Sequence, residues 1–409
     1  MGEKAPAFEE HGEVLAHWAE QGFSQETIVV LDHHLDLKRL SDVAVNRIKA
    51  AESPESLAGL NRRLPFSEAR GTYGLDSFLY GAALRQIVSH VIWVFPERRP
   101  LSALDLRDLL WSRLEKIAGH GSEILESFRY TPDSASASIL GVRFELSTLQ
   151  RLHRVVPPNA LVDVDLDFFF DGQPQLTHPL SEVEETFRRA KLRTALPSFA
   201  YSISSGFMPE HMRWVGDALA TELGITLEAR GRAPHAAPRT MDLVGAELPP
   251  MPEDIERVWT QELEALGAAG WSGAALLWAN AGETARAAEA IRHAQAGDEA
   301  ASWASYRLGL QAMERRQWDA AQEWLLPLTA HPADTLQVHS LALVSLVQAR
   351  LGAYEAALAS ATRCVELAPL QDGGYRIARW AAKQLGHAVP EAIAAAEERR
   401  RVARERGSS

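Results

Sequence analysis

The pattern of apolar and polar positions differs between the two halves of the chain. In the first half, apolar runs rich in β-branched and aromatic residues occur at 27–31, 90–95, 139–146, 160–170 and 198–203. Several of these runs are apolar on both faces, which is typical of strands in a parallel sheet that is covered on both sides. Helix-like segments lie between them at 104–118, 181–191 and 210–223. This alternation predicts an α/β domain with a layered parallel sheet.

A proline-rich connector ends this pattern. Three prolines stand within residues 249–252, and proline propagates neither a helix nor a central strand. We therefore expect the α/β domain at 1–246 and a second domain at 253–396. The remaining residues, 397–409, form a charged tail that mixes both signs.

The second domain has no strand signals, and one turn-then-helix pattern returns along it. The small residues Ala287, Ala321 and Ala357 mark equivalent places in this pattern and are spaced by 34 and 36 positions. That period resembles the tetratricopeptide repeat (TPR), whose paired helices need small residues where they cross. We predict an all-α helical-repeat domain, with an irregular helical bundle as the alternative.

Composition narrows the classes of function. The 409 residues carry 42 Lys and Arg against 54 Asp and Glu, and the net charge of -12 disfavours a general nucleic-acid-binding surface. The single cysteine, Cys364, excludes a disulfide framework and any site built from several thiolates. No apolar stretch approaches the ~20 residues that span a bilayer, and the N-terminus lacks a signal-like apolar core. We expect a cytoplasmic protein that binds neither nucleic acid nor membranes and holds any metal by His and carboxylate.

Two acidic clusters contain the candidate functional residues. Asp32, His34 and Asp36 follow the apolar run 28–31, so they would lie at the carboxyl end of a strand, where α/β sheets bind ligands.

The second cluster, Asp163, Asp165 and Asp167, alternates with apolar residues within 160–170 and would share one face of a strand. Burying three like charges is costly unless cations neutralise them, so the pattern predicts a metal site. A solvated edge strand is the alternative, and the apolar run 168–170 argues against it.

Together, these D-x-H-x-D and D-x-D motifs resemble the metal motifs of the arginase and deacetylase superfamily. That family also uses a His ahead of the first motif. His11, in the sequence E-H-x-E-V-L, stands 21 residues before Asp32, and His17 is its competitor. With the D-x-D-x-D-F-F strand, the opening is most similar to the peptide arginases, which convert arginine to ornithine within ribosomally made peptides. The resemblance covers about the first 240 residues and implies a three-layer α/β fold.

The resemblance also implies two Mn²⁺ ions bridged by a hydroxide that acts as the nucleophile. One ion would be held by His11, Asp32, Asp36 and Asp163, and the other by Asp32, His34, Asp163 and Asp165. Arginases place a Gly two residues before their third Asp, whereas here Asp167 follows Leu166 directly. A register that uses Asp165 and Asp167 therefore stays open beside the favoured one.

A cationic guanidinium also needs a carboxylate to orient it. Arginases use a Glu after a Gly-rich turn, and Glu210 follows Gly206, 45 residues after Asp165. The alternative for Glu210 is a first-turn Glu favoured by the helix dipole. Asp76 is a weaker candidate for substrate contact, because it also suits a helix cap. Asp165 is the expected proton carrier.

The expected function is hydrolysis of the guanidinium of arginine to give ornithine and urea. A helical repeat suits extended peptides, so we expect arginine within a peptide or precursor peptide rather than free arginine. The repeats would hold that peptide or a partner protein. Alternatively, they would join two chains of a homo-oligomer. Two other functions stay open: deacetylase-like amide hydrolysis, typically served by one zinc with two Asp and one His, and a non-catalytic TPR scaffold.

Overall fold

The computed structural model describes residues 3–62, 72–171, 175–192, 198–234, 249–294, 298–331 and 334–407. Within these residues, nine strands form one sheet in the order β4-β5-β6-β3-β2-β7-β8-β1-β9. The strands are β1 (Glu3–Phe8), β2 (Glu26–Leu31), β3 (Val88–Phe95), β4 (Arg129–Tyr130), β5 (Ala135–Ile139), β6 (Val142–Thr148), β7 (Leu161–Asp165), β8 (Ser198–Ala200) and β9 (Ile225–Ala229). All pairs are parallel except β4 with β5 and β5 with β6. The predicted α/β domain with a mainly parallel sheet is confirmed.

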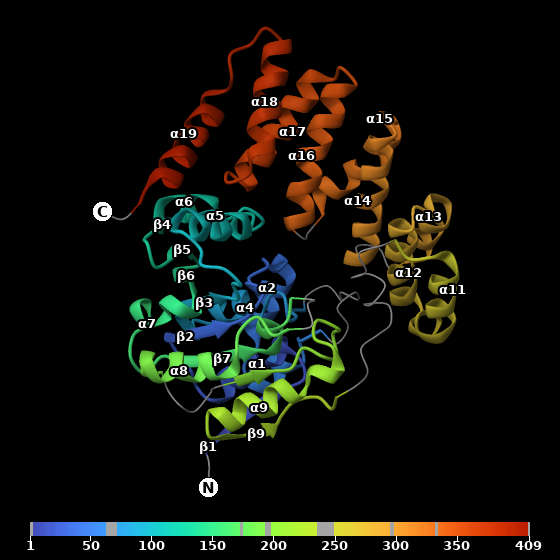
Figure 1. Cartoon of the computed structure of the whole chain (residues 1–409). Coiled ribbons are helices and arrows are strands. Elements are labelled where there is room, and N and C mark those ends of the chain that lie inside the picture. The colour runs from blue at the N-terminus through green and yellow to red at the C-terminus, as the bar shows by residue number, and fades with distance from the viewer. Residues whose placement is uncertain are drawn as a thin grey trace.

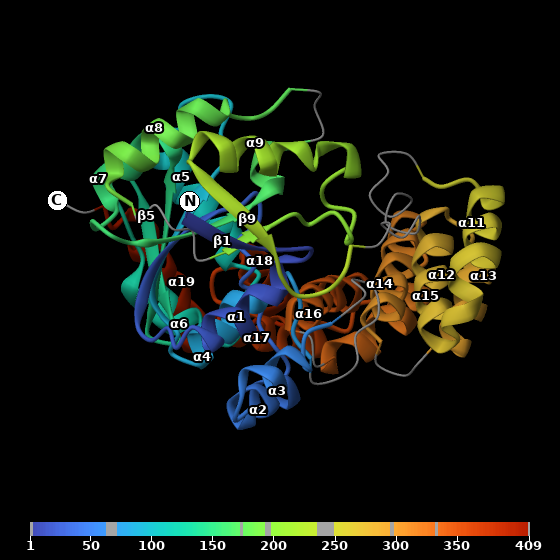
Figure 2. The ribbon, with the colours of Figure 1, turned by 90° about the horizontal axis from the view of Figure 1, so that it is seen from below.

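Helices cover both faces of the sheet (Figure 2). One face carries α1 (Val14–Glu20), α2 (Asp42–Ala50), α3 (Pro54–Ala58), α4 (Phe78–Leu84), α5 (Ala103–Leu114) and α6 (Gly121–Ser127). The other face carries α7 (Leu152–Val155), α8 (Leu180–Ala190) and α9 (Trp214–Glu222). Two separate apolar cores result, one on each side of the sheet, so the strands between them are buried on both faces.

Two of the apolar runs predicted as strands are not single strands. The run 139–146 contains a tight turn, because Leu140 and Gly141 adopt positive φ angles of 56° and 75° and join β5 to β6 as a hairpin. The run 160–170 stops being a strand at Asp165, where a 3-10 helix, η3 (Leu166–Phe169), begins. The Asp165 side chain accepts a hydrogen bond from the backbone N–H of Asp167, which stabilises this turn.

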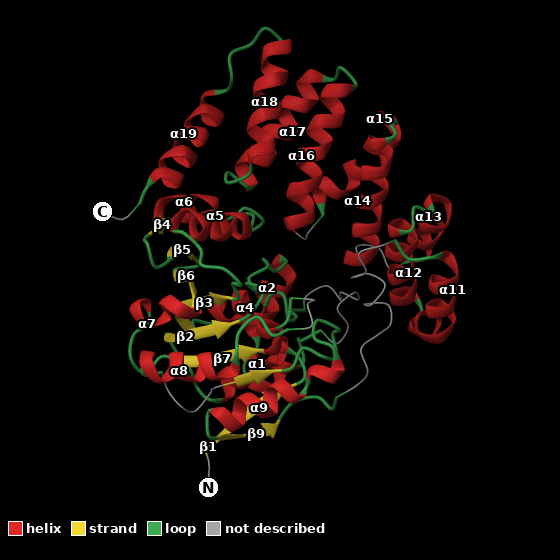
Figure 3. Cartoon of the chain, viewed as in Figure 1, coloured by secondary structure: helices red, strands yellow, loops and turns green. Residues whose placement is uncertain are grey.

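An all-α region follows the sheet domain, as predicted (Figures 1 and 3). Its helices are α11 (Pro252–Val258), α12 (Ala268–Asn280), α13 (Thr284–His293), α14 (Glu299–Glu314), α15 (Trp318–Leu325), α16 (Asp334–Arg350), α17 (Tyr354–Leu367), α18 (Asp372–Gln384) and α19 (Glu391–Glu405). The three equivalent small residues, Ala287, Ala321 and Ala357, are fully buried, as close helix crossings require. The predicted domain end at 246 and connector residues 247 and 248 lie outside the described residues.

The last helices lie against α5 and α6 of the sheet domain (Figure 1). The backbone N–H of Gly119 donates to Leu367, and the Gln371 side chain donates to the Glu115 carbonyl. The charged tail continues α19, where Ala403 is fully buried and Arg404 pairs with Asp108 at 2.9 Å. Among the described residues, no helix combines the length and apolar character needed to cross a membrane.

Candidate metal centre

The two acidic clusters meet at the carboxyl ends of β2 and β7, in the middle of the sheet. The register pairs Leu31 of β2 with Val164 of β7. The next residues along the two strands, Asp32 and Asp165, therefore emerge side by side. Because hydrophobic layers cover both faces of the sheet here, the acidic side chains are buried rather than solvated.

A first group of ligand atoms comes from three segments of the chain. It consists of His11, Asp32, Asp36 and Asp165, whose candidate ligand atoms all lie within 4.8 Å of one another. Nδ1 of His11 lies 3.2 Å from Asp32 Oδ2 and 3.1 Å from both Asp36 Oδ2 and Asp165 Oδ2. All four residues are buried, so this group could hold a metal ion.

His11 is held in place by contacts at Nε2, the ring nitrogen that faces away from the first group. It begins the 3-10 helix η1 (His11–Glu13) between β1 and α1. Its Nε2 lies 2.6 Å from Asp163 Oδ2. The Ser198 hydroxyl donates to the other oxygen of Asp163 and accepts from the Trp18 indole N–H at 3.1 Å. A metal-binding His commonly gives its second N–H to a carboxylate, which fixes the ring so that its other nitrogen faces the metal.

A second group shares one carboxylate with the first. It consists of Asp32, His34 and Asp167. His34 Nδ1 lies 2.8 Å from Asp167 Oδ2 and 3.9 Å from Asp32 Oδ1. The two groups overlap at Asp32, one of the two residues, with Asp163, that the resemblance placed in both ligand sets.

The two groups use Asp165 and Asp167 rather than Asp163 and Asp165. The favoured ligand sets contained Asp163, which the structure instead places on the far side of the His11 ring. The physical reason is the end of β7 at Asp165: the 3-10 turn carries Asp167 towards His34, and Asp163 stays one strand repeat deeper in the sheet. The arrangement matches the alternative register that the sequence left open.

The carboxylates of the first group crowd one another. Burial raises the pKa of Asp32 well above its usual value, and the charges of Asp36 and Asp167 raise it further. Burial likewise raises the pKa values of Asp36 and Asp165. Such a site favours either protons or cations, and a divalent ion would relieve both the repulsion and the loss of solvation.

The other predicted residues lie elsewhere. Glu210 begins the 3-10 helix η4 (Glu210–Met212), is exposed, and belongs to neither group. Asp76 pairs with Lys38 at 3.2 Å and with Arg62 at 2.5 Å, and it too belongs to neither group. His17, the competitor of His11, lies on α1 with its Nδ1 3.6 Å from Glu20.

Sequence reasoning missed Glu10, a buried carboxylate directly before His11. It is 7% exposed, and among the described residues neither of its oxygens has a hydrogen-bond partner of acceptable geometry. Burial raises the pKa of Glu10 to about 8; Ser205 lowers it and the charge of Asp165 raises it. Because Ser205 contacts this buried carboxylate without a hydrogen bond of good geometry, its oxygens can still accept a cationic or hydrogen-bonding ligand.

The centre is more open on the side of His34. The His34 side chain is 41% exposed, whereas the ligands of the first group are almost fully buried. Phe207, in the loop after β8, lies edge-on to the His34 ring with 5.3 Å between ring centroids. In the same loop, Ser202 donates to Asp165 Oδ2 at 2.7 Å. This loop therefore both positions a candidate ligand and borders the more open side.

No model of a known protein family matches the chain, and a search of curated proteins finds no significant match.

Proposed function

We propose that this chain is a metal-dependent hydrolase that cleaves the guanidinium of a peptidyl arginine to give ornithine and urea. The observation that carries the proposal is the pair of overlapping ligand groups that share Asp32. The donors are carboxylates and imidazoles without thiolates, a set that suits hard divalent ions such as Mn²⁺. We infer two Mn²⁺ ions, one for each group. The peptide-arginase resemblance and the buried carboxylates support this assignment.

The residues that would hold the ions are His11, Asp32, Asp36 and Asp165 for one, and Asp32, His34 and Asp167 for the other. When bound, two such ions would lower the pKa of a water between them, which makes it a nucleophile, and their positive charge would stabilise the negative charge that develops during its attack. Asp163 and Ser198 fix the His11 ring, so that Nδ1 would be available to an ion held by the first group.

Asp165 is the proposed proton carrier, held by the hydroxyl of Ser202. The water oxygen bonds to the guanidinium carbon, and the bond from that carbon to the side-chain nitrogen of arginine breaks. Asp165 takes one proton from the attacking water and gives it to the departing amine, and the second proton passes from the oxygen to the same amine through solvent, so that neutral urea and a protonated amine result. Urea and the ornithine side chain are the products.

Glu10 takes the role for which the sequence suggested Glu210. Its carboxylate is buried, and apart from the contact with Ser205 neither oxygen has a hydrogen-bond partner of good geometry among the described residues. Burial is the main cause of its raised pKa, and the charge of Asp165 adds to it. A guanidinium has several N–H donors in one plane and can pair with a carboxylate through two of them. Pairing with Glu10 would hold the guanidinium beside the ions and exclude uncharged side chains.

A second candidate function is deacetylase-like amide hydrolysis with one zinc ion. The second group favours it, because Asp32, His34 and Asp167 are the two Asp and one His of a one-zinc site. Under this alternative, His11 and Asp36 would bind no ion, and their burial beside Asp165 would have no explanation.

The test combines metal analysis with mass spectrometry. The full chain is purified, loaded with Mn²⁺ and incubated with a set of arginine-containing peptides and, separately, with free arginine. We expect loss of CN2H2 from arginine in some peptides, equimolar urea, and neither product with Asp32→Asn. Urea from free arginine without any change in peptide mass would contradict the peptide substrate. One zinc per chain together with amide cleavage would favour the second candidate.

A further inference from the structure

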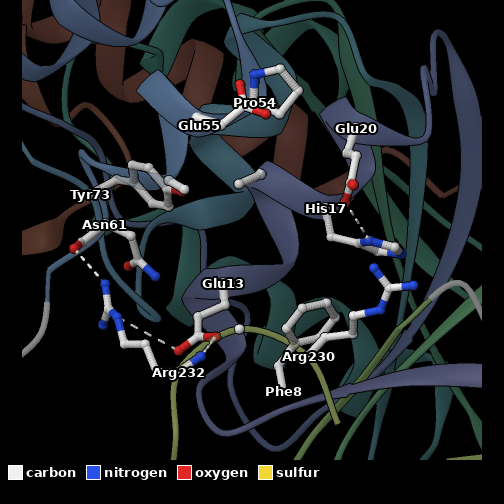
Figure 4. A pocket seen from close by; sticks show the side chains of 13 residues that line it. Phe8, Glu13, His17, Glu20, Pro54, Glu55, Asn61, Tyr73, Arg230 and Arg232 are labelled. Atoms are coloured by element: carbon white, nitrogen blue, oxygen red, sulfur yellow. Dashed lines mark hydrogen bonds and ion pairs between the residues drawn. The ribbon is translucent and has the colours of Figure 1, made fainter. Parts of the chain in front are cut away.

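A cavity of about 330 Å³ lies beside the η1 turn and is lined in part by Glu13 of that turn (Figure 4). Its walls come from α1, from α3, and from the segment after β9, which contains Arg230 and Arg232. Phe8 and Tyr73 contribute aromatic rings, and Ala16 and Ala58 leave room between them. The cavity therefore combines an apolar body with polar groups at its edge.

Two buried polar groups that line this cavity lack hydrogen-bond partners, although Oε1 of Glu13 lies 3.8 Å from Nε of Arg232 in a loose ion pair. Among the described residues, the Tyr73 hydroxyl and Oε1 of Glu13 have no hydrogen-bond partner, although Tyr73 is 0% and Glu13 8% exposed. The other Glu13 oxygen accepts from the backbone N–H of Arg232 at 3.0 Å. Burying such groups without partners is unfavourable, which points to a ligand that completes them. An amide fits both, because its N–H can donate to Glu13 and its carbonyl can accept from Tyr73.

The position of the cavity relative to the metal centre follows from the sheet. Glu13 and His11 belong to the same η1 turn, and the cavity lies at the ends of β1 and β9. The metal centre lies at the end of β7, which is separated from β1 by β8. Neighbouring strands are about 4.8 Å apart, so two or three strand spacings amount to roughly 10 to 15 Å. An extended peptide covers that distance in about three or four residues.

We propose that this cavity is a subsite for the peptide residue three or four positions from the target arginine. The main-chain amide of that residue bonds to Glu13 Oε1 and the Tyr73 hydroxyl, and its apolar side chain packs against the rings of Phe8 and Tyr73. The subsite rests on the proposed function for the arginine itself. It adds recognition of a second peptide residue, so that substrate recognition would extend along the carboxyl edge of the sheet.

Photo-crosslinking tests the subsite without relying on turnover. The probes are nine-residue peptides with one arginine in an alanine and serine background, in which benzoylphenylalanine is placed two to six positions from the arginine on either side. With the Mn²⁺-loaded full chain, we expect crosslinks from an offset of three or four to map to residues 8–20, 54–61 or 230–232. Crosslinks from these offsets to α14–α18, or to no defined segment, would overturn the proposal.

Equilibrium binding supplies the second measurement. Fluorescence anisotropy of the same peptide, with phenylalanine at the best offset and a terminal dye, is measured with Tyr73→Phe and with the control Tyr306→Phe in the helical region. Loss of one hydrogen bond predicts an affinity about threefold to tenfold weaker for Tyr73→Phe. Tyr306→Phe should match the unmodified chain. Ala58→Trp, which fills the cavity from an exposed position on α3, should weaken binding further without disturbing the core.

The two proposals fail in different ways. Tyr73-dependent binding without any ornithine would keep the subsite and overturn the proposed reaction. Ornithine formation with equal peptide affinities for Tyr73→Phe and Tyr306→Phe would keep the reaction and overturn the subsite.

Discussion

Asp163 lies behind His11, with its Oδ2 2.6 Å from Nε2 on the side of the ring opposite to Asp32, Asp36 and Asp165. Under the proposed metal site, this contact makes Asp163 a positioning residue rather than a ligand. Its other oxygen accepts from Ser198, which in turn accepts from Trp18, so a buried chain of hydrogen bonds fixes the orientation of the imidazole.

Asp163→Asn should weaken Mn²⁺ binding without abolishing it. The amide keeps the shape of the side chain but removes the charge that orients His11, and loss of such a partner typically costs about 10-fold to 100-fold in metal affinity. Asp165→Asn, which alters a proposed ligand, should reduce affinity more strongly. Calorimetric titration of the metal-free variants with Mn²⁺ measures both. An equal and complete loss in the two variants would instead make Asp163 a ligand.

The shared position of Asp32 predicts how many ions each variant retains. His34→Ala removes a donor only from the second group, so the protein should change from two Mn²⁺ per chain to one. Asp32→Asn removes a donor from both groups and should leave fewer than one Mn²⁺ per chain. Equilibrium dialysis followed by elemental analysis gives the numbers.

Thermal melting provides a check on the same variants. Mn²⁺ at 100 times its dissociation constant should stabilise the unmodified chain by about 2.7 kcal/mol per site, because only the folded state binds it. Asp32→Asn should lose most of this response. An unmodified chain that melts at the same temperature with Mn²⁺ and with a chelator would argue against a metal site.

The sequence predicted that Asp32 follows the end of a strand, but it placed Asp163, Asp165 and Asp167 within one strand and could not decide between the two registers. The alternation of Asp163, Asp165 and Asp167 with apolar residues indicates one long strand. The capping hydrogen bond from the backbone of Asp167 to the side chain of Asp165 ends the strand there, and such a local turn leaves no mark on the period of apolar positions.

Four strands of the sheet, β1, β4, β5 and β9, were not predicted, apart from Ile139, the last residue of β5, which begins the run 139–146. Glu3–Phe8 contains a proline and two charged residues, and Ile225–Ala229 pairs with it at the sheet edge. The edge strands are β4 and β9, and edge strands are often short and partly polar, so they resemble loops in sequence. β1 is an inner strand between β8 and β9, and its proline and charged residues hid it. The importance of Glu10 was hidden for a related reason: its burial depends on segments far apart in the chain, including Ser205.

Glu10→Gln should reduce kcat/KM for the peptide substrate by about 10-fold to 100-fold. The neutral amide can still accept one hydrogen bond from the guanidinium, but it loses the charge-assisted pairing, which is worth about 1.5 to 3 kcal/mol. Glu210→Gln is the matched control, because Glu210 is exposed and outside both ligand groups. Urea release at several peptide concentrations measures the effect. A larger loss for Glu210→Gln than for Glu10→Gln would restore the role that the sequence gave to Glu210.

Glu97 makes the stability of the fold depend on pH, independently of the proposed reaction. It lies just beyond the end of β3, where its Oε2 is 3.8 Å from the imidazole of His178. Burial raises its pKa from 4.5 to about 7, and a hydrogen bond with Thr148 opposes this. Between these two values the folded chain retains a proton that the unfolded chain releases. The contribution to stability is therefore present below pH 4.5 and is lost as the pH rises through 7.

Glu97→Gln should remove this loss, because the amide stays neutral at every pH. From pH 5 to pH 8, the free energy of unfolding of the unmodified chain should fall relative to that of Glu97→Gln by about 2 to 3 kcal/mol. Urea denaturation of both proteins at the two pH values, with the same Mn²⁺ concentration, gives this difference directly. Taking the difference between the two proteins cancels the other titrating groups, since they are common to both. A difference that stays constant with pH would mean that Glu97 is already ionised in the folded chain at pH 5.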